Sequence, residues 1–97
     1  MDNIEFIVNR KLEFLKYLKL RLPLYHMSNV FSRDLQYNVQ SYFADHGTKV
    51  NYPDAEKLAA QLATVYEQDG IYRRINRQTW RLSYPEFTLP RIEKKAS

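Results

Sequence analysis

The sequence predicts a mainly α-helical domain that ends in a short β-hairpin. Apolar residues recur every three or four positions along most of the first 69 residues, and proline or glycine interrupts this pattern. The pattern then changes to alternation in the segment GIYRRINRQTWRLSY. Spacings of three and four place side chains on one face of a helix, whereas alternation places them on one face of a strand. The length of 97 residues fits one domain, predicted to span 1–87, with a loosely held tail at 88–97.

The first predicted helix runs from Asn3 to about Leu22, where Pro23 ends it because proline has no amide donor. Its apolar stripe consists of Ile4, Ile7, Val8, Leu12, Leu15, Leu18 and Leu22. Further apolar residues beside the stripe make the apolar surface wider than one neighbour requires. Two interpretations are open: residues 1–22 pair with a second copy in a homodimer, or the helix is purely intramolecular. A membrane-surface role is less favoured, because the core needs this helix.

Two more helices are predicted, from about Asn29 to Asp45 and from Pro53 to Asp69. Ser28 or Asn29 is expected to cap the former, and Gly47 to close it in a left-handed conformation. Proline suits the first turn of the latter, where acidic residues favour the helix dipole. The residues predicted to face inward are Phe31, Leu35, Val39, Tyr42 and Phe43, then Ala55, Leu58, Ala59, Leu62, Val65 and Tyr66.

After Gly70, two strands are predicted at about 71–75 and 79–84, joined by a polar turn. The hairpin has four arginines and no acidic residue, so its charge is +4: Arg73, Arg74, Arg77 and Arg81. Planar guanidinium groups match phosphate oxygens, which favours contacts to nucleic-acid phosphates. The alternative is a solvated hairpin whose charge prevents pairing with strands of other chains.

The composition argues against an enzyme, a metal-binding protein and a membrane protein. The net charge is +4 with an isoelectric point near 9.4, and residues 10–21 form a second basic block. Cysteine is absent, His26 and His46 have no suitably spaced partner, and two glycines cannot build a phosphate-binding loop. We therefore predict no enzyme activity, no catalytic residues, no metal and no cofactor. Without a long apolar run or a basic, apolar start, the chain is expected to be cytoplasmic.

The order of three helices and a hairpin resembles the winged helix-turn-helix family. The resemblance is clearest in LAAQLATVYEQDGIYRRINRQTWRLSYP, residues 58–85. It implies that helix 53–69 enters the major groove of DNA and that hairpin 71–84, the wing of this family, lies along the phosphates. Two features differ from the family: the connection at 45–52 is longer than the usual tight turn, and the third helix carries net negative charge.

The outer face of the third helix supplies the other candidate contacts. Gln61 is suited to hydrogen-bond adenine and Thr64 to touch a thymine methyl group, although an ordinary solvated face explains them equally well. The predicted residues for binding double-stranded DNA are Lys57, Gln61, Thr64, Gln68, Arg73, Arg74, Arg77 and Arg81. The many tyrosines among basic residues also suit stacking on single strands, and the sequence does not decide between the two.

The leading hypothesis is a small winged-helix protein that binds double-stranded DNA as a homodimer and regulates transcription. The alternative is a protein-interaction module or inhibitor, of the kind that phages and plasmids encode, which keeps the winged fold without binding DNA. The acidic third helix and the wide apolar first helix would suit that alternative.

Overall fold

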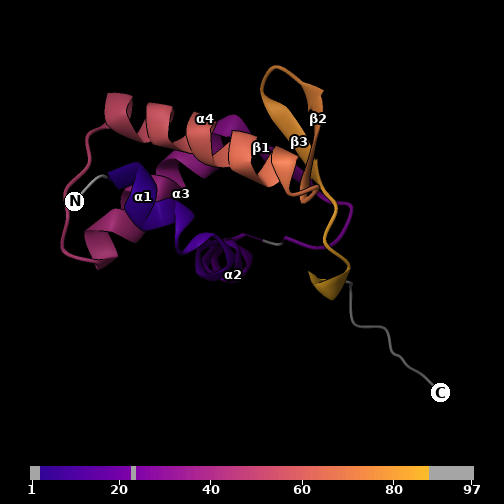
Figure 1. The fold of residues 1–97 in the computed structure, drawn as a ribbon, viewed down its shortest axis with the longest axis horizontal. Helices are drawn as coiled ribbons and strands as arrows, with labels where there is room; N and C mark the ends of the chain where they lie inside the picture. The colour runs from indigo at the N-terminus through magenta and orange to yellow at the C-terminus, as the bar shows by residue number, and fades with distance from the viewer. Residues whose placement is uncertain (1–2, 23, 88–97) are drawn as a thin grey trace.

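The computed structural model describes residues 3–22 and 24–87, which form four α-helices and a three-stranded antiparallel sheet (Figure 1). The elements are α1 Asn3–Val8, α2 Lys11–Arg21, β1 Asn29–Phe31, α3 Ser32–Asp45, α4 Tyr52–Gln68, β2 Tyr72–Asn76 and β3 Thr79–Leu82, followed by a 3-10 turn at Pro85–Phe87. The mainly helical class with a hairpin near the C-terminus is confirmed. The predictions for Pro23 and for the tail at 88–97 lie outside the described residues.

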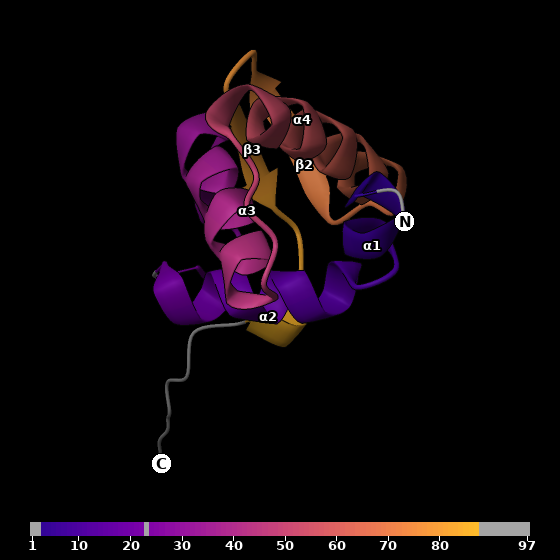
Figure 2. The same ribbon diagram turned by 90° about the vertical axis from the view of Figure 1, so that its left-hand side faces the viewer.

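The N-terminal segment is two helices, so the prediction of one helix over 3–22 is wrong. The chain breaks at Asn9 and Arg10, and Arg10 folds back with its guanidinium 4.0 Å from the centroid of the Phe6 ring. Figure 2 shows the result: α1 lies beside α4, while α2 crosses beneath α3. The wide apolar surface is thereby divided between two neighbours. The break also turns Leu12 outward, where 51% of it is exposed.

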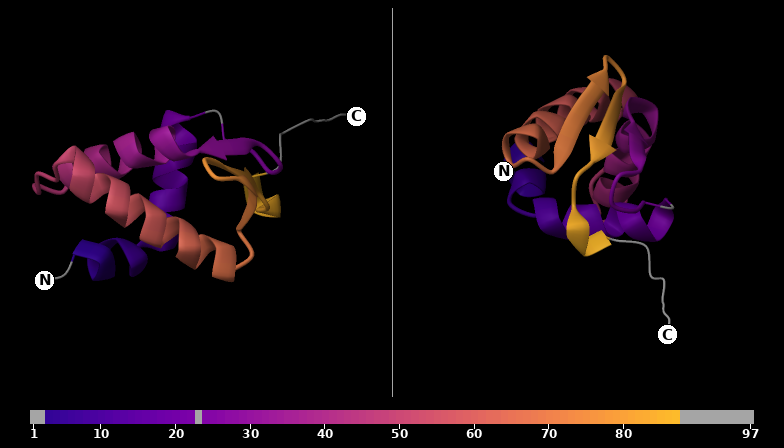
Figure 3. Two further views of the ribbon diagram at one scale, coloured as in Figure 1. Left: turned by 90° about the horizontal axis from the view of Figure 1, so that it is seen from above. Right: turned by 90° about the vertical axis from the view of Figure 1, so that its right-hand side faces the viewer.

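The second predicted helix, α3, begins at Ser32, three residues later than predicted, because Asn29–Phe31 forms strand β1 (Figure 3). This strand pairs with β3, and Val30 lies opposite Trp80, so both apolar side chains are buried. The predicted capping by Ser28 or Asn29 is wrong as well. The Ser28 hydroxyl instead bonds the amide and carbonyl of Tyr25, and no side chain caps α3.

Local signals around α4 are confirmed. Gly47, after α3, has the left-handed φ of +81° that was predicted for it, and Pro53 lies in the first turn of α4. The cap of α4 was not predicted: the Asn51 side chain accepts a 2.9 Å hydrogen bond from the amide of Asp54. Such a cap stabilises a helix by about 1 kcal/mol.

The sheet has the order β1-β3-β2, so the hairpin is joined by a third strand that the sequence analysis assigned to a helix. A bulge between Arg74 and Asn76 interrupts the pairing near the turn of the hairpin. Trp80 and Leu82 of β3 face the helices and are buried, as their alternation with polar residues predicted.

One core joins all of these elements. Its largest fully buried side chains are Tyr42, Tyr66, Tyr72, Phe14, Phe43, Ile7, Leu15, Leu18, Leu24, Leu35, Leu62 and Leu82. The predicted inward faces of α3 and α4 are confirmed except at Phe31, which is 48% exposed at the end of β1, and at Val65, which is half-buried.

Two buried tyrosines of this core differ in their hydrogen bonding. The Tyr66 hydroxyl donates to the backbone carbonyl of Lys11, whereas the Tyr72 hydroxyl has no partner among the described residues. Burial raises the pKa of both phenols well above the usual 10. The folded protein therefore keeps both protonated at pH values where the unfolded chain ionises them.

Tyr72→Phe is expected to raise the free energy of unfolding by about 1 kcal/mol, since it removes a buried hydroxyl without a protein partner. Chemical denaturation at pH 7 measures this change, and Tyr66→Phe, which loses a hydrogen bond, should instead lower stability.

The two tyrosines also make stability depend on alkaline pH. Because their pKa values are raised in the folded protein, the free energy of unfolding has its full value below pH 10 and falls above it. Tyr72→Phe should therefore also reduce that alkaline loss, and destabilisation at pH 7 would contradict the prediction.

Candidate nucleic-acid interface

The four candidate residues of α4 form one exposed stripe. Lys57, Gln61, Thr64 and Gln68 are all exposed, at spacings of three and four residues. They lie on the side of the helix opposite its buried residues, such as Leu62. The Thr64 hydroxyl donates to the carbonyl of Ala60 at 3.1 Å. The structure thus brings these side chains onto one accessible surface.

Arg74 makes several contacts within the protein, although 47% of its side chain is exposed. Its guanidinium lies 3.1 Å from a carboxylate oxygen of Glu67 on α4 and 4.9 Å from the centroid of the Trp80 ring. It also donates to the carbonyls of Asn76 and Arg77, each at 3.2 Å. Arg74 therefore connects the hairpin to α4, and its guanidinium is already paired with a carboxylate.

Arg73 and Arg81 lie directly opposite each other in the register of β2 and β3. Directly opposite residues share a face of the sheet, and here that face is turned away from buried Trp80 and Leu82. Both arginines are exposed, as is Arg77 in the turn, and no ion pair to any of the three occurs within 3–22 and 24–87. Two like charges directly opposite each other destabilise a strand pair by up to about 1 kcal/mol, unless an anion joins them.

The arginines of the hairpin therefore fall into two sets. Arg77 and Arg74 line a hollow of about 220 Å³ between the hairpin and Ala60 of α4, whereas Arg73 and Arg81 occupy the opposite face of the sheet. This split agrees with the expectation that neighbouring residues on a strand point to opposite faces. A duplex that contacts all of them has to accept the hairpin into a groove, with phosphates on both faces of the sheet.

Two of the acidic residues that give α4 its negative charge are neutralised internally. Glu67 accepts a 2.6 Å hydrogen bond from the Trp80 indole in addition to its contact with Arg74. Asp69, directly after the helix, pairs with Lys11 at 2.6 Å. The middle and end of the exposed stripe thus carry no free carboxylate. The contact between Trp80 and Glu67 could have been predicted from the sequence, because a buried tryptophan needs a hydrogen-bond acceptor and Glu67 is close in the chain.

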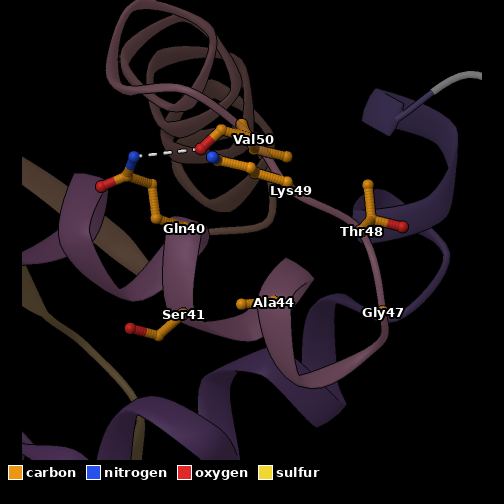
Figure 4. Close-up of a pocket in the computed structure, with 7 residues that line it drawn as sticks. All are labelled: Gln40, Ser41, Ala44, Gly47, Thr48, Lys49 and Val50. Carbon is orange, nitrogen blue, oxygen red and sulfur yellow. Dashed lines mark hydrogen bonds between the residues drawn. The ribbon is translucent and has the colours of Figure 1, made fainter.

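The long connection between α3 and α4 borders an open hollow of about 520 Å³ (Figure 4). The Gln40 side chain spans it and donates to the carbonyl of Val50 at 3.0 Å. Lys49 is the charged residue of its lining, which we call the loop hollow.

A third hollow, of about 390 Å³, lies between the start of α3, the start of α4 and the turn of the hairpin. We call it the Arg33 hollow, after the exposed arginine in its lining. This region was not predicted from the sequence, because Arg33, Tyr52 and Gln78 belong to segments that are separate in the sequence and meet only in the fold.

A cluster of side chains that could bind a metal ion is not found in the described part of the chain. That part contains no group of three or more histidine and acidic side chains placed to hold a metal ion. Nor is any of its helices long and apolar enough to cross a bilayer. Comparison of the chain with known proteins found no matching protein-family model, no matching curated protein and no matching solved structure.

Proposed function

We propose that this protein binds double-stranded DNA through the exposed stripe of α4 and the arginine hairpin. The observation that carries the proposal is the set of three exposed arginines at 73, 77 and 81, which have no ion pair within 3–22 and 24–87. Two of them face each other across neighbouring strands, a placement that an anionic partner would stabilise. DNA phosphates are the partners that such guanidinium groups fit.

The relative position of α4 and the hairpin supports the same proposal. The hairpin follows α4 directly and is fixed beside it by Glu67, Arg74 and Trp80. A helix in the major groove with a basic hairpin on the neighbouring phosphates is the arrangement of the winged helix-turn-helix family. We therefore propose a winged-helix protein that acts in gene regulation.

Fluorescence anisotropy with a random-sequence duplex, measured across a salt series, tests the proposal. If three arginines contact phosphates, the logarithm of the association constant should fall against the logarithm of salt concentration with a slope of about −2.7 or steeper. A duplex that stays unbound even at low salt would overturn the proposal. It would favour the alternative role in protein interaction.

The exposed stripe of α4 should supply the sequence preference. Gln61→Ala is expected to lower affinity for a site selected from a random pool by about 1–3 kcal/mol, while affinity for random duplex changes little. Competition between the selected and random duplexes measures this difference. Equal losses on both duplexes would mean that Gln61 does not read bases.

We further propose that α2 pairs with a second copy. Leu12 and Leu20 of this helix are 51% and 88% exposed. In an antiparallel pair centred on Lys16, Leu12 lies opposite Leu20 of the other copy, and Glu13 lies opposite Lys19. Sedimentation equilibrium should give twice the chain mass of 11.7 kDa, and Leu20→Arg should give the single mass. A single mass for both proteins at concentrations of tens of micromolar would contradict the pairing.

A further inference from the structure

Three hollows follow one another along the outside of α3 and around the turn of the hairpin. The Arg33 hollow adjoins the hollow that contains Arg77, because Ser32, Gln36 and Glu56 line both. The loop hollow begins one turn further along α3, at Gln40. Together they form a band over a surface that the proposed DNA-binding stripe of α4 does not use.

Two exposed tyrosines lie in the middle of this band. Tyr37 is one helical turn from Gln40, and Tyr52 lines the Arg33 hollow. Their ring centroids are 5.8 Å apart, and the side chains are 51% and 40% exposed. The Tyr52 hydroxyl donates to the side chain of Gln36, which fixes the orientation of that ring. Phe31, 48% exposed, adds a third ring to the same lining.

Each hollow also contains an exposed cation without an ion pair in the described part of the chain. These are Lys49 in the loop hollow, Arg33 in its own hollow, and Arg77 at the turn of the hairpin. Glu56 is the one carboxylate in the three linings. Positive charges are thus distributed along the band, with aromatic rings between them.

We propose that this band binds an unpaired nucleic-acid strand. Bases stack on Tyr37 and Tyr52, while the phosphates contact Lys49, Arg33 and Arg77. Exposed rings between cations form the usual platform for single strands, because every base has a face that can stack. The core of a protein interface, by contrast, is depleted of charged residues.

This inference extends the proposed DNA binding, since Arg77 belongs to both surfaces. A duplex on the hairpin and a single strand on the band would meet at this arginine. The preferred ligand is therefore a junction, a duplex whose one strand continues unpaired.

Anisotropy measurements with three probes test the inference: a blunt duplex of about two helical turns, the same duplex with a single-stranded extension, and a free single strand of about ten nucleotides. The extended duplex should bind more tightly than the blunt one. Tyr37→Ala should weaken the extended duplex and the free strand roughly 10- to 100-fold and leave the blunt duplex unchanged. Tyr37→Phe keeps the ring and should bind as the unaltered protein does.

Glu56→Gln provides a test of charge at the same surface. Loss of the carboxylate should tighten binding of the free single strand several-fold, and weaker binding would contradict the inference. A 2-aminopurine base in the strand should lose fluorescence on binding, and this loss should be smaller with Tyr37→Ala. Thermal unfolding confirms that each variant is folded.

The three probes separate this inference from the proposed function. If the blunt duplex binds but the extension adds no affinity and Tyr37→Ala changes nothing, the inference is overturned and the proposed function stands. If the free strand binds in a Tyr37-dependent way but the blunt duplex does not bind, the inference stands and the proposed function fails.

Discussion

Alanine at Arg73, Arg77 and Arg81 together is expected to lower affinity for random duplex DNA by nearly three orders of magnitude at 0.1 M salt. Each arginine that neutralises a phosphate releases close to one counterion, and each such release contributes roughly a factor of ten at this salt concentration. The slope of the salt dependence should become shallower by about 2.7. Anisotropy across a salt series measures both quantities.

Two single variants serve as controls for this triple substitution. Lys49→Ala removes an exposed positive charge from the connection between α3 and α4, outside the surface proposed for duplex DNA, and should leave the slope unchanged. Arg74→Ala removes a guanidinium already paired with Glu67, so it should lower stability more than it changes the slope. A slope that changes as much per removed charge for Lys49→Ala as for the triple variant would mean that net charge, rather than the hairpin, governs binding.

Phe14→Ala is expected to cost about 3–5 kcal/mol of the free energy of unfolding. Phe14 is fully buried on α2, with its ring centroid 5.2 Å from that of Tyr42 and 6.0 Å from that of Tyr17. Its removal leaves a cavity in the aromatic cluster that joins α2 to α3. For a domain of this size the melting temperature should fall by more than about 12 °C.

Calorimetry or thermal circular dichroism measures the shift, with Lys49→Ala as the exposed control. The control should change the free energy of unfolding by no more than about 0.5 kcal/mol. A loss below about 1 kcal/mol for Phe14→Ala would show that α2 is not packed against α3 as described.

Signals that act within a few residues predicted most of the C-terminal half correctly. The left-handed glycine at 47, the proline of the first turn of α4 and the alternation around Trp80 each determine structure locally. The errors arose where tertiary contacts decide the structure. Val30 is in a strand because β3 provides a partner for it, about 50 residues further along the chain.

The helix break at Asn9 has the same kind of cause. Periodicity alone continues through this position, but α1 and α2 pack against different neighbours. The candidate site was likewise predicted only in part. The sequence identified the charged hairpin, but could not show that Arg74 is occupied by Glu67 or that Arg33, Tyr37 and Tyr52 lie along one band.

The start of α2 is fastened to the end of α4 at two points: the Tyr66 hydroxyl reaches the Lys11 carbonyl, and the Lys11 side chain reaches Asp69. These contacts join residues that are 55 and 58 positions apart in the sequence. Strand β1 likewise pairs with β3, which follows much later in the chain. During synthesis the first helices therefore leave the ribosome before the segments that they contact at these points have emerged. Closing such long loops slows folding, and the emerging chain should acquire protease resistance only after the hairpin has left the ribosomal tunnel.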